Sequence, residues 1–104
     1  MNFVNCTPHA LTILGLGTLP PSGVVPRCTT ARVEMPPIGG LRLVRQEMGA
    51  VTGLPDAAPD TIYIVSGMVL GALNGTRSDV VAPDTGADAV RENGQIVAVR
   101  GFVC

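Results

Sequence analysis

Several residue types that serve common functions are missing or rare in this sequence. Its 104 residues contain no lysine and no tryptophan, and they contain one histidine, one tyrosine and two phenylalanines. All seven basic residues are therefore arginine, and the net charge is −1. Because nucleic acid and anionic membranes attract a basic surface, this balance predicts no binding to DNA, RNA or membrane. Arginine pairs with phosphate or carboxylate through two parallel hydrogen bonds, although a GC-rich genome would favour arginine as well.

Cysteines are few and have no recognisable spacing. Cys6, Cys28 and Cys104 make an odd number without a Cys-x-x-Cys pair, which fits neither a disulfide framework nor a structural zinc site. We expect three free thiols, no bound metal and no cofactor. Residues 1–14 have neither a basic start nor a continuous apolar core. No signal peptide is therefore expected, and the predicted location is the cytoplasm.

The length and the turn residues predict one small domain that spans residues 1–104. Short apolar runs are separated by clusters of Gly, Pro, Asn and Asp, which is typical of short strands joined by turns. The predicted fold class is α+β and mostly β, with mainly antiparallel strands and one short buried helix near residues 66–75. Strands are expected over residues 2–5, 10–14, 24–35, 41–51, 62–65, 80–82 and 96–103, with a loop at 36–40, one helical turn at 87–91 and a hairpin turn at 92–94.

Residues 61–86 are the stretch around which the rest of the chain is expected to pack. Residues 62–65 (Ile-Tyr-Ile-Val) form a short apolar run, which is typical of a strand covered on both faces. Ser66 is a suitable N-cap and Asn74 a suitable left-handed C-cap, so a short helix is predicted between them. This helix is nearly all apolar and far shorter than the roughly 20 residues that cross a bilayer. Protein must therefore bury it.

Three glycines repeat along this helix. Gly67, Gly71 and Gly75 are spaced by four residues and so fall on one face. A glycine inside a helix costs about 1 kcal/mol relative to alanine, so the pattern needs a reason. Either a second subunit or a ligand closely approaches the helix backbone, or the glycines make room for the sheet beneath. The first interpretation, with the apolar surface of the helix, predicts a homo-oligomer.

The sequence gives little support to any known catalytic motif. Residues 84–88 (Asp-Thr-Gly-Ala-Asp) match the motif of retroviral-type aspartic proteases, in which two chains each supply one aspartate. Pro83 stands where that motif needs an apolar strand residue, and the eighteen residues that follow Gly86 are too few for the remaining sheet. No glycine-rich segment has the spacing of a phosphate-binding loop. We predict that the protein is not an enzyme, and an aspartic protease that acts through Asp84-Thr85-Gly86 is the least supported functional class.

Five segments resemble a group of small proteins from bacteriophages and prophages of GC-rich hosts. They are Asn5-Cys6-Thr7-Pro8-His9, Pro20-Pro21-Ser22-Gly23, Gly53-Leu54-Pro55, residues 61–66 and residues 77–86. In segment order and chain length, that group is similar to the first family of anti-Thoeris proteins. The resemblance implies a phage-encoded sponge that acts in the host cytoplasm and sequesters a cyclic ADP-ribose derivative or another cyclic nucleotide without degrading it. It further implies a symmetric homo-oligomer with ligand pockets between its subunits.

The candidate ligand contacts combine this resemblance with the arginines of the loops. Arg77 and Arg91 are the first choices for a pyrophosphate, and Asp79 can accept hydrogen bonds from ribose hydroxyl groups. Tyr63 is the best candidate to stack on the base or to hydrogen-bond with it. The full predicted set is Arg77, Arg91, Asp79, Tyr63, Arg32, Arg100 and Asn74. Two alternatives stay open: Arg77 and Asp79 form an ion pair that orders their loop, or the protein is a phage structural or protein-interaction module without a small-molecule ligand.

Overall fold

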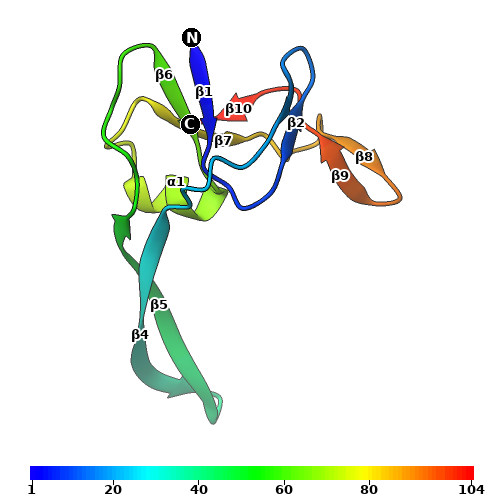
Figure 1. Cartoon of the computed structure of the whole chain (residues 1–104). Coiled ribbons are helices and arrows are strands. Elements are labelled where there is room, and N and C mark those ends of the chain that lie inside the picture. Colours follow the sequence, from blue (N-terminus) through cyan, green and yellow to red (C-terminus); the bar gives the residue numbers. More distant parts are fainter.

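The structure, a computed structural model, describes residues 1–104 and contains ten strands and one helix (Figure 1). In chain order the elements are β1 (Asn2–Asn5), β2 (Leu11–Ile13), β3 (Gly17–Leu19), β4 (Arg27–Ile38), β5 (Leu41–Thr52), β6 (Thr61–Ile64), α1 (Gly67–Leu73), β7 (Val80–Pro83), β8 (Val90–Glu92), β9 (Gln95–Ala98) and β10 (Phe102–Val103). Short strands with one short helix confirm the predicted mostly-β α+β class.

A four-stranded sheet in the order β1-β6-β7-β10 forms the centre of the molecule. Strands β1 and β7 both run parallel to β6, and β10 runs antiparallel to β7. The helix α1 connects β6 to β7, because parallel neighbours need a crossover instead of a tight turn. The three remaining pairs, β2-β3, β4-β5 and β8-β9, are antiparallel hairpins. The strands are thus mainly antiparallel, while the middle of the central sheet is parallel.

Residues of the central strand alternate between two apolar clusters, one on each face of the sheet. Tyr63 and Val65 pack on the α1 side with Val69 and Val80, while Ile64 packs on the other side with Val99. This alternation follows from the two-residue period of a β-strand. It confirms that the run at residues 62–65 is covered on both faces.

The helix begins and ends at the predicted residues. The Ser66 hydroxyl accepts a hydrogen bond from the Val69 backbone N–H, and Asn74 adopts the left-handed conformation (φ 50°) at the C-cap. The expectation that the helix is buried holds for one side alone, because Val69 is its one buried residue and Met68 is 59% exposed. No helix in the structure has the length and apolar character needed to cross a membrane. In a single chain, α1 therefore keeps an apolar side in contact with solvent.

The longest strands form a two-stranded hairpin, residues 27–52, which we call the hairpin arm. Strands β4 and β5 each contain 12 residues, and the arm extends away from the central sheet (Figure 1). The predicted loop at residues 36–40 is wrong, because β4 continues through Pro36 and Pro37 to Ile38. An irregularity in the pairing between Met35 and Ile38 accommodates both prolines, which cannot donate to the ladder. The turn is reduced to residues 39–40.

The C-terminal part differs from the predicted pattern at two places. Residues 87–91 form no helical turn, and Val90 instead starts β8. The single strand expected over 96–103 is interrupted between β9 and β10, since Val99 forms an isolated bridge to Ile13 across the molecule. The hairpin turn is confirmed, with Asn93 (φ 52°) and Gly94 (φ 78°) both at the positive φ values of a type I′ turn.

Candidate functional site

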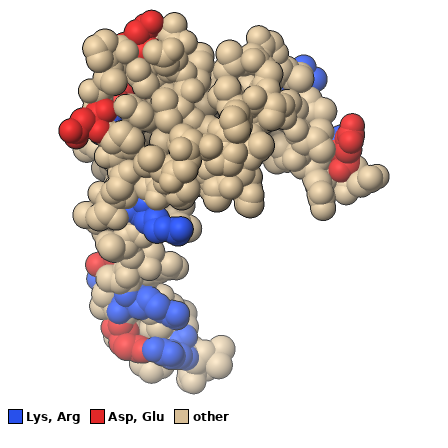
Figure 2. Space-filling view, in the orientation of Figure 1, with Lys and Arg blue, Asp and Glu red and all other residues tan.

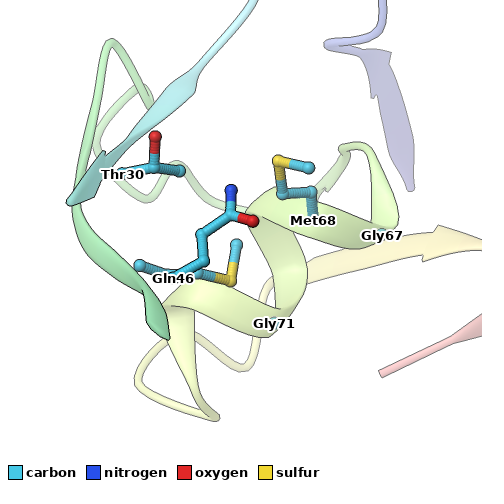
Figure 3. Close-up of a pocket in the computed structure, with 6 residues that line it drawn as sticks. Thr30, Gln46, Gly67, Met68 and Gly71 are labelled. Atoms are coloured by element: carbon cyan, nitrogen blue, oxygen red, sulfur yellow. The ribbon is translucent and has the colours of Figure 1, made fainter. Parts of the chain in front are cut away.

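A groove runs along the exposed side of α1, and we call it the α1 groove. It has a volume of about 680 Å³. Its lining comprises Gly67, Leu70, Gly71, Leu73, Asn74, Gly75, Arg77, Ser78, Val80, Val103 and Cys104. A smaller hollow of about 390 Å³ lies between α1 and the base of the hairpin arm, where Thr30 and Gln46 face Met68 (Figure 3). Gly67 and Gly71 line both spaces, so the glycine side of the helix separates two adjoining hollows.

The glycines of α1 do not make room for any part of their own chain. A Cβ atom added at Gly67, Gly71 or Gly75 would meet no heavy atom within 4 Å. Gly75 has a positive φ of 76°, so its glycine is explained by the turn after the helix. Gly67 and Gly71 have no such conformational reason. The interpretation that they accommodate the sheet is therefore wrong, and their backbone stays open to the grooves.

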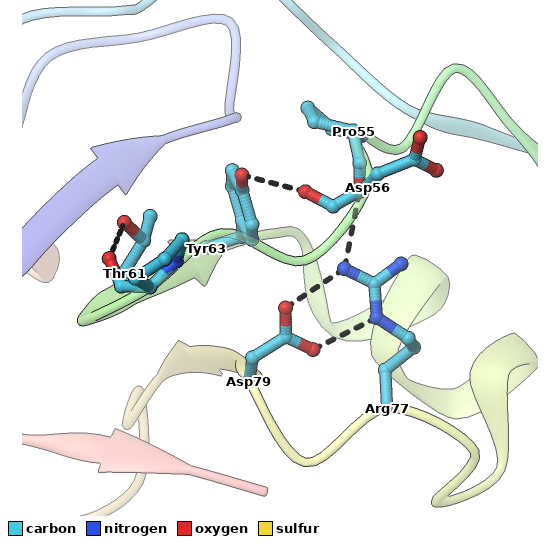
Figure 4. Close-up of polar contacts among 7 residues, drawn as sticks. Pro55, Asp56, Thr61, Tyr63, Arg77 and Asp79 are labelled. Carbon is cyan, nitrogen blue, oxygen red and sulfur yellow. Dashed lines mark hydrogen bonds and ion pairs between the residues drawn. The ribbon is translucent and has the colours of Figure 1, made fainter.

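Arg77 is held at the edge of the α1 groove by three hydrogen bonds (Figure 4). Its Nε donates to Oδ1 of Asp79 at 2.8 Å, and its Nη2 donates to Oδ2 of Asp79 at 2.8 Å and to the Pro55 carbonyl at 3.0 Å. The side chains are 25% and 19% exposed, so this ion pair is mostly removed from solvent. The loop-ordering ion pair left open by the sequence is thus present. The Nη1 group of Arg77 forms no hydrogen bond within the chain.

The ion pair shifts the pKa values of both partners. The hydrogen bond from Arg77 holds the pKa of Asp79 below its ordinary value of 3.8, although partial burial opposes this effect. The hydrogen bond to Asp79 raises the pKa of Arg77 above its ordinary value. Both groups are therefore charged throughout the physiological pH range. The pair fixes the loop between α1 and β7 in a defined geometry.

Asp79→Asn is expected to destabilise the folded chain at pH 7 by about 1–3 kcal/mol, because a charge-assisted pair is lost. Since the pKa of Asp79 is lowered on folding, its stabilising contribution is present above pH 3.8 and is lost as the pH falls through the folded pKa. The difference in unfolding free energy between parent and variant should shrink over that range. Urea titrations at several pH values measure this difference. Asp88→Asn is the control, because the Asp88 carboxylate makes no hydrogen bond; a pH-independent difference for Asp79→Asn contradicts the assignment.

Tyr63 cannot serve as the stacking platform that the sequence suggested. It is buried in the cluster between β6 and α1, and its hydroxyl donates to the Asp56 carbonyl at 2.9 Å (Figure 4). The reason is its position in the middle strand of the sheet, where both faces are covered. Its ring supports the core, and its hydroxyl anchors the segment that also supplies the Pro55 carbonyl to Arg77.

The other predicted arginines lie outside the α1 groove of their own chain. Arg91, in β8, donates to the carbonyl oxygens of Ala89, Thr85 and Gly86 at 3.0–3.3 Å. Arg100 donates to the Asp88 carbonyl at 3.0 Å. Arg32 is exposed on the hairpin arm. Of the predicted set, Arg77 and Asn74 line the α1 groove, and Asp79 is bonded to Arg77 without lining it. Arg91, Arg100 and Arg32 are not among the residues that line the groove.

The segment that matched a protease motif forms a turn after β7. The Asp84 carboxylate accepts a hydrogen bond from the Gly86 backbone N–H at 3.0 Å, and Arg91 ties down the next carbonyl groups. Cys6, Cys28 and Cys104 are free thiols, as expected. No three His, Cys, Asp or Glu side chains gather closely enough to hold a metal ion.

Several groove residues were not predicted from the sequence, among them Ser78, Val103 and Cys104. Ser78 is adjacent to Arg77, so the polar run at residues 77–79 was the available signal for it. Val103 and Cys104 reach the groove because β10 pairs with β7, and no local pattern announces that pairing. Comparison of the chain with protein families, curated proteins and solved structures found no match.

Proposed function

We propose that the protein binds an anionic nucleotide signal, a cyclic nucleotide or a cyclic ADP-ribose derivative, in the α1 groove and releases it chemically unchanged. The observation that carries this proposal is the fixed guanidinium of Arg77 beside an open groove of about 680 Å³. This volume lies within the roughly 300–1,000 Å³ typical of small-molecule sites. The resemblance to phage proteins supports a role as an anti-defence sponge in the host cytoplasm.

The groove supplies both polar and apolar contacts of the kind that a nucleotide needs. Arg77 offers its free Nη1 to a phosphate oxygen, and the ion pair with Asp79 already holds the guanidinium in place. Holding a donor in position before binding reduces the conformational entropy that binding costs. Asp79 does not line the α1 groove, and both of its carboxylate oxygens accept from Arg77, so its proposed role is to hold the guanidinium and not to bind a ribose hydroxyl.

The base would lie against aliphatic groups instead of an aromatic ring. Leu70, Leu73 and Val103 line the groove, and the bare backbone at Gly71 lets a flat ring approach the helix closely. These contacts cover one side of a ligand. A surface from a second subunit is the proposed cover for the other side, which agrees with a pocket between subunits and with the scattered positions of Arg91 and Arg32.

A second function is favoured by a different observation. The hairpin arm exposes long apolar side chains on a projecting hairpin, which is typical of a surface that binds another protein. A structural or interaction module would need this arm and no nucleotide. The two functions differ in one measurable property, which is whether the purified protein binds a nucleotide.

Titration calorimetry with cyclic ADP-ribose, a cyclic dinucleotide and AMP tests the proposal. We expect saturable binding of at least one cyclic compound with a Kd below about 10 µM, and weaker binding of AMP. The cyclic compound presents its phosphates and riboses in one fixed arrangement, so it loses less entropy than an open nucleotide. Absence of binding by all three at about 1 mM would overturn the proposal and leave the interaction module.

A further inference from the structure

The hairpin arm is largely uncovered by the rest of the chain. Among the other elements it packs mainly against α1, and its distal half extends into solvent (Figure 1). The radius of gyration is 16.4 Å, whereas a compact domain of this length has about 13 Å. An isolated two-stranded hairpin is at best marginally stable in water. The arm therefore lacks the partner surface that strands of 12 residues normally require.

The distal half of the arm presents an apolar stripe. Val33 is on the same face as Met35 and its cross-strand partner Leu43, because alternate residues of a strand share a face. Ile38 and Leu41 extend this apolar surface at the tip, where they are 64% and 71% exposed. We call these five residues the distal stripe.

The accessible surface of the chain shows how much area is left uncovered. It measures 6844 Å², whereas a compact monomer of this mass exposes about 5,500 Å². The excess of about 1,300 Å² is larger than the roughly 800 Å² that each partner buries in a standard protein interface. An interface of standard size therefore fits within this excess.

The arm and the rest of the chain have net charges of opposite sign. The arm has four arginines and two glutamates, a net charge of +2, while the remaining residues have three arginines and six acidic residues, a net charge of −3. Arg42 pairs with Glu34 and Arg45 with Glu47, which leaves Arg27 and Arg32 without an acidic partner. Figure 2 shows blue side chains together with some red ones on the arm, and red side chains with a few blue ones at the edges of the body.

The unpaired carboxylates lie outside the arm. Each is free of ion pairs within the chain; they are Asp56, Asp84, Asp88 and Glu92. Each copy of the chain thus has a basic arm and an acidic body, so the arm of one copy is complementary in charge to the body of another.

We propose that the hairpin arm docks on the body of a second copy of this chain, with the arms exchanged about a twofold axis. The distal stripe is buried in this contact, and Arg27 and Arg32 face carboxylates of the partner. In this arrangement each arm is covered by the body of the other subunit, and no further subunit can be added at the same contact. Such closed twofold symmetry is usual for homodimers. Nucleic acid is a poorer fit, because the acidic body would repel it. This inference concerns the partner and not the ligand, so it holds for either function proposed above.

Light scattering during size-exclusion chromatography tests the proposal on the natural chain and two matched variants. The natural chain is expected at twice its mass of 10.7 kDa. Leu43→Asp, in the distal stripe, should weaken dimerisation by about thirtyfold or more, because it places a charge in the centre of the contact. Leu16→Asp, in the turn of the β2-β3 hairpin, which carries none of the four unpaired carboxylates, should remain dimeric, although Leu16 is 44% exposed and Leu43 is 40% exposed. Arg32→Glu should weaken the dimer and reduce its sensitivity to salt.

Hydrogen exchange provides a test that requires no variant. Amides of the arm should exchange more slowly at high than at low protein concentration, while those of β6 should not change. A monomeric natural chain, concentration-independent exchange of the arm, or an unchanged dimer in Leu43→Asp overturns the proposal. Binding of the monomer to duplex DNA or to anionic phosphatidylglycerol vesicles through Arg32 also overturns it. A dimer that binds no nucleotide contradicts the proposed function alone. A monomer that binds one contradicts this inference and the proposed cover from a second subunit, but not the α1 groove as the binding site.

Discussion

Gly71→Leu is expected to abolish nucleotide binding while the chain itself becomes more stable. A Cβ atom at this position meets nothing within 4 Å, and glycine costs a helix about 1 kcal/mol relative to good helix formers, so the folded chain should gain stability. The larger side chain would project into the α1 groove and occupy the space of the ligand. We expect a loss of affinity of about a hundredfold or more, equal to about 2.7 kcal/mol. Calorimetry measures the affinity, and thermal unfolding measures the stability.

Two further variants make this result specific. Gly71→Ala, with a smaller side chain, should give an intermediate affinity. Gly101→Leu should bind as the natural chain does, because a Cβ at Gly101 also meets nothing within 4 Å and the residue lies outside the groove. Unchanged binding by a folded Gly71→Leu variant contradicts the α1 groove as the site. Loss of the dimer together with the ligand would instead assign the glycine side to a contact between subunits.

Arg77→Ala is expected to weaken nucleotide binding by about ten- to a hundredfold, because one charge-assisted hydrogen bond to phosphate contributes about 1.5–3 kcal/mol. Arg77→Lys should restore part of the affinity, since it keeps the charge but loses the planar fork that pairs with Asp79. Arg42→Ala is the control, because Arg42 is exposed and pairs with Glu34 on the arm. Equal affinity in Arg77→Ala and the natural chain would make Arg77 a purely structural residue.

Arg91→Ala examines whether the pocket lies between subunits. Arg91 does not line the α1 groove of its own chain, and its guanidinium orders the loop at residues 84–89. A tenfold or greater loss of affinity in a folded, dimeric variant would require Arg91 of the second subunit to reach the ligand. Unchanged affinity would show that the residue was wrongly chosen from the sequence and that its function is to order the loop.

Local signals in the sequence predicted the two ends of the helix, one hairpin turn and one ion pair. Ser66 and Asn74 mark the two ends of the helix because capping depends on hydrogen bonds within a few residues. The turn at Asn93-Gly94 follows equally from the φ values that these residues adopt readily. Arg77 and Asp79 were placed together because they are two residues apart in one loop.

Pairing between distant segments could not be predicted in this way. Strand β1 lies parallel to β6 although residues 6–60 separate them, and no local pattern specifies that neighbour. The pairing of β10 with β7 brings Val103 to the groove. The position of β6 between β1 and β7 buries Tyr63 in the core. Pro36 and Pro37 predict a loop because proline cannot donate to a ladder, yet an irregularity in the pairing of the arm accommodates both. The sequence therefore predicts the polar loop at residues 77–79, but it does not predict the strand pairing that brings Val103 and Cys104 to the same groove.

The most direct test of nucleotide sequestration is mass spectrometry of what the protein retains. Purified protein is incubated with a mixture of cyclic nucleotides and ADP-ribose derivatives, separated from free compounds and heated to release any bound molecule. We predict recovery of one compound, chemically intact and in stoichiometric proportion to the subunits, and its loss in Gly71→Leu. Recovery of no compound, or of a hydrolysed product whose amount increases with protein concentration, would contradict binding without turnover.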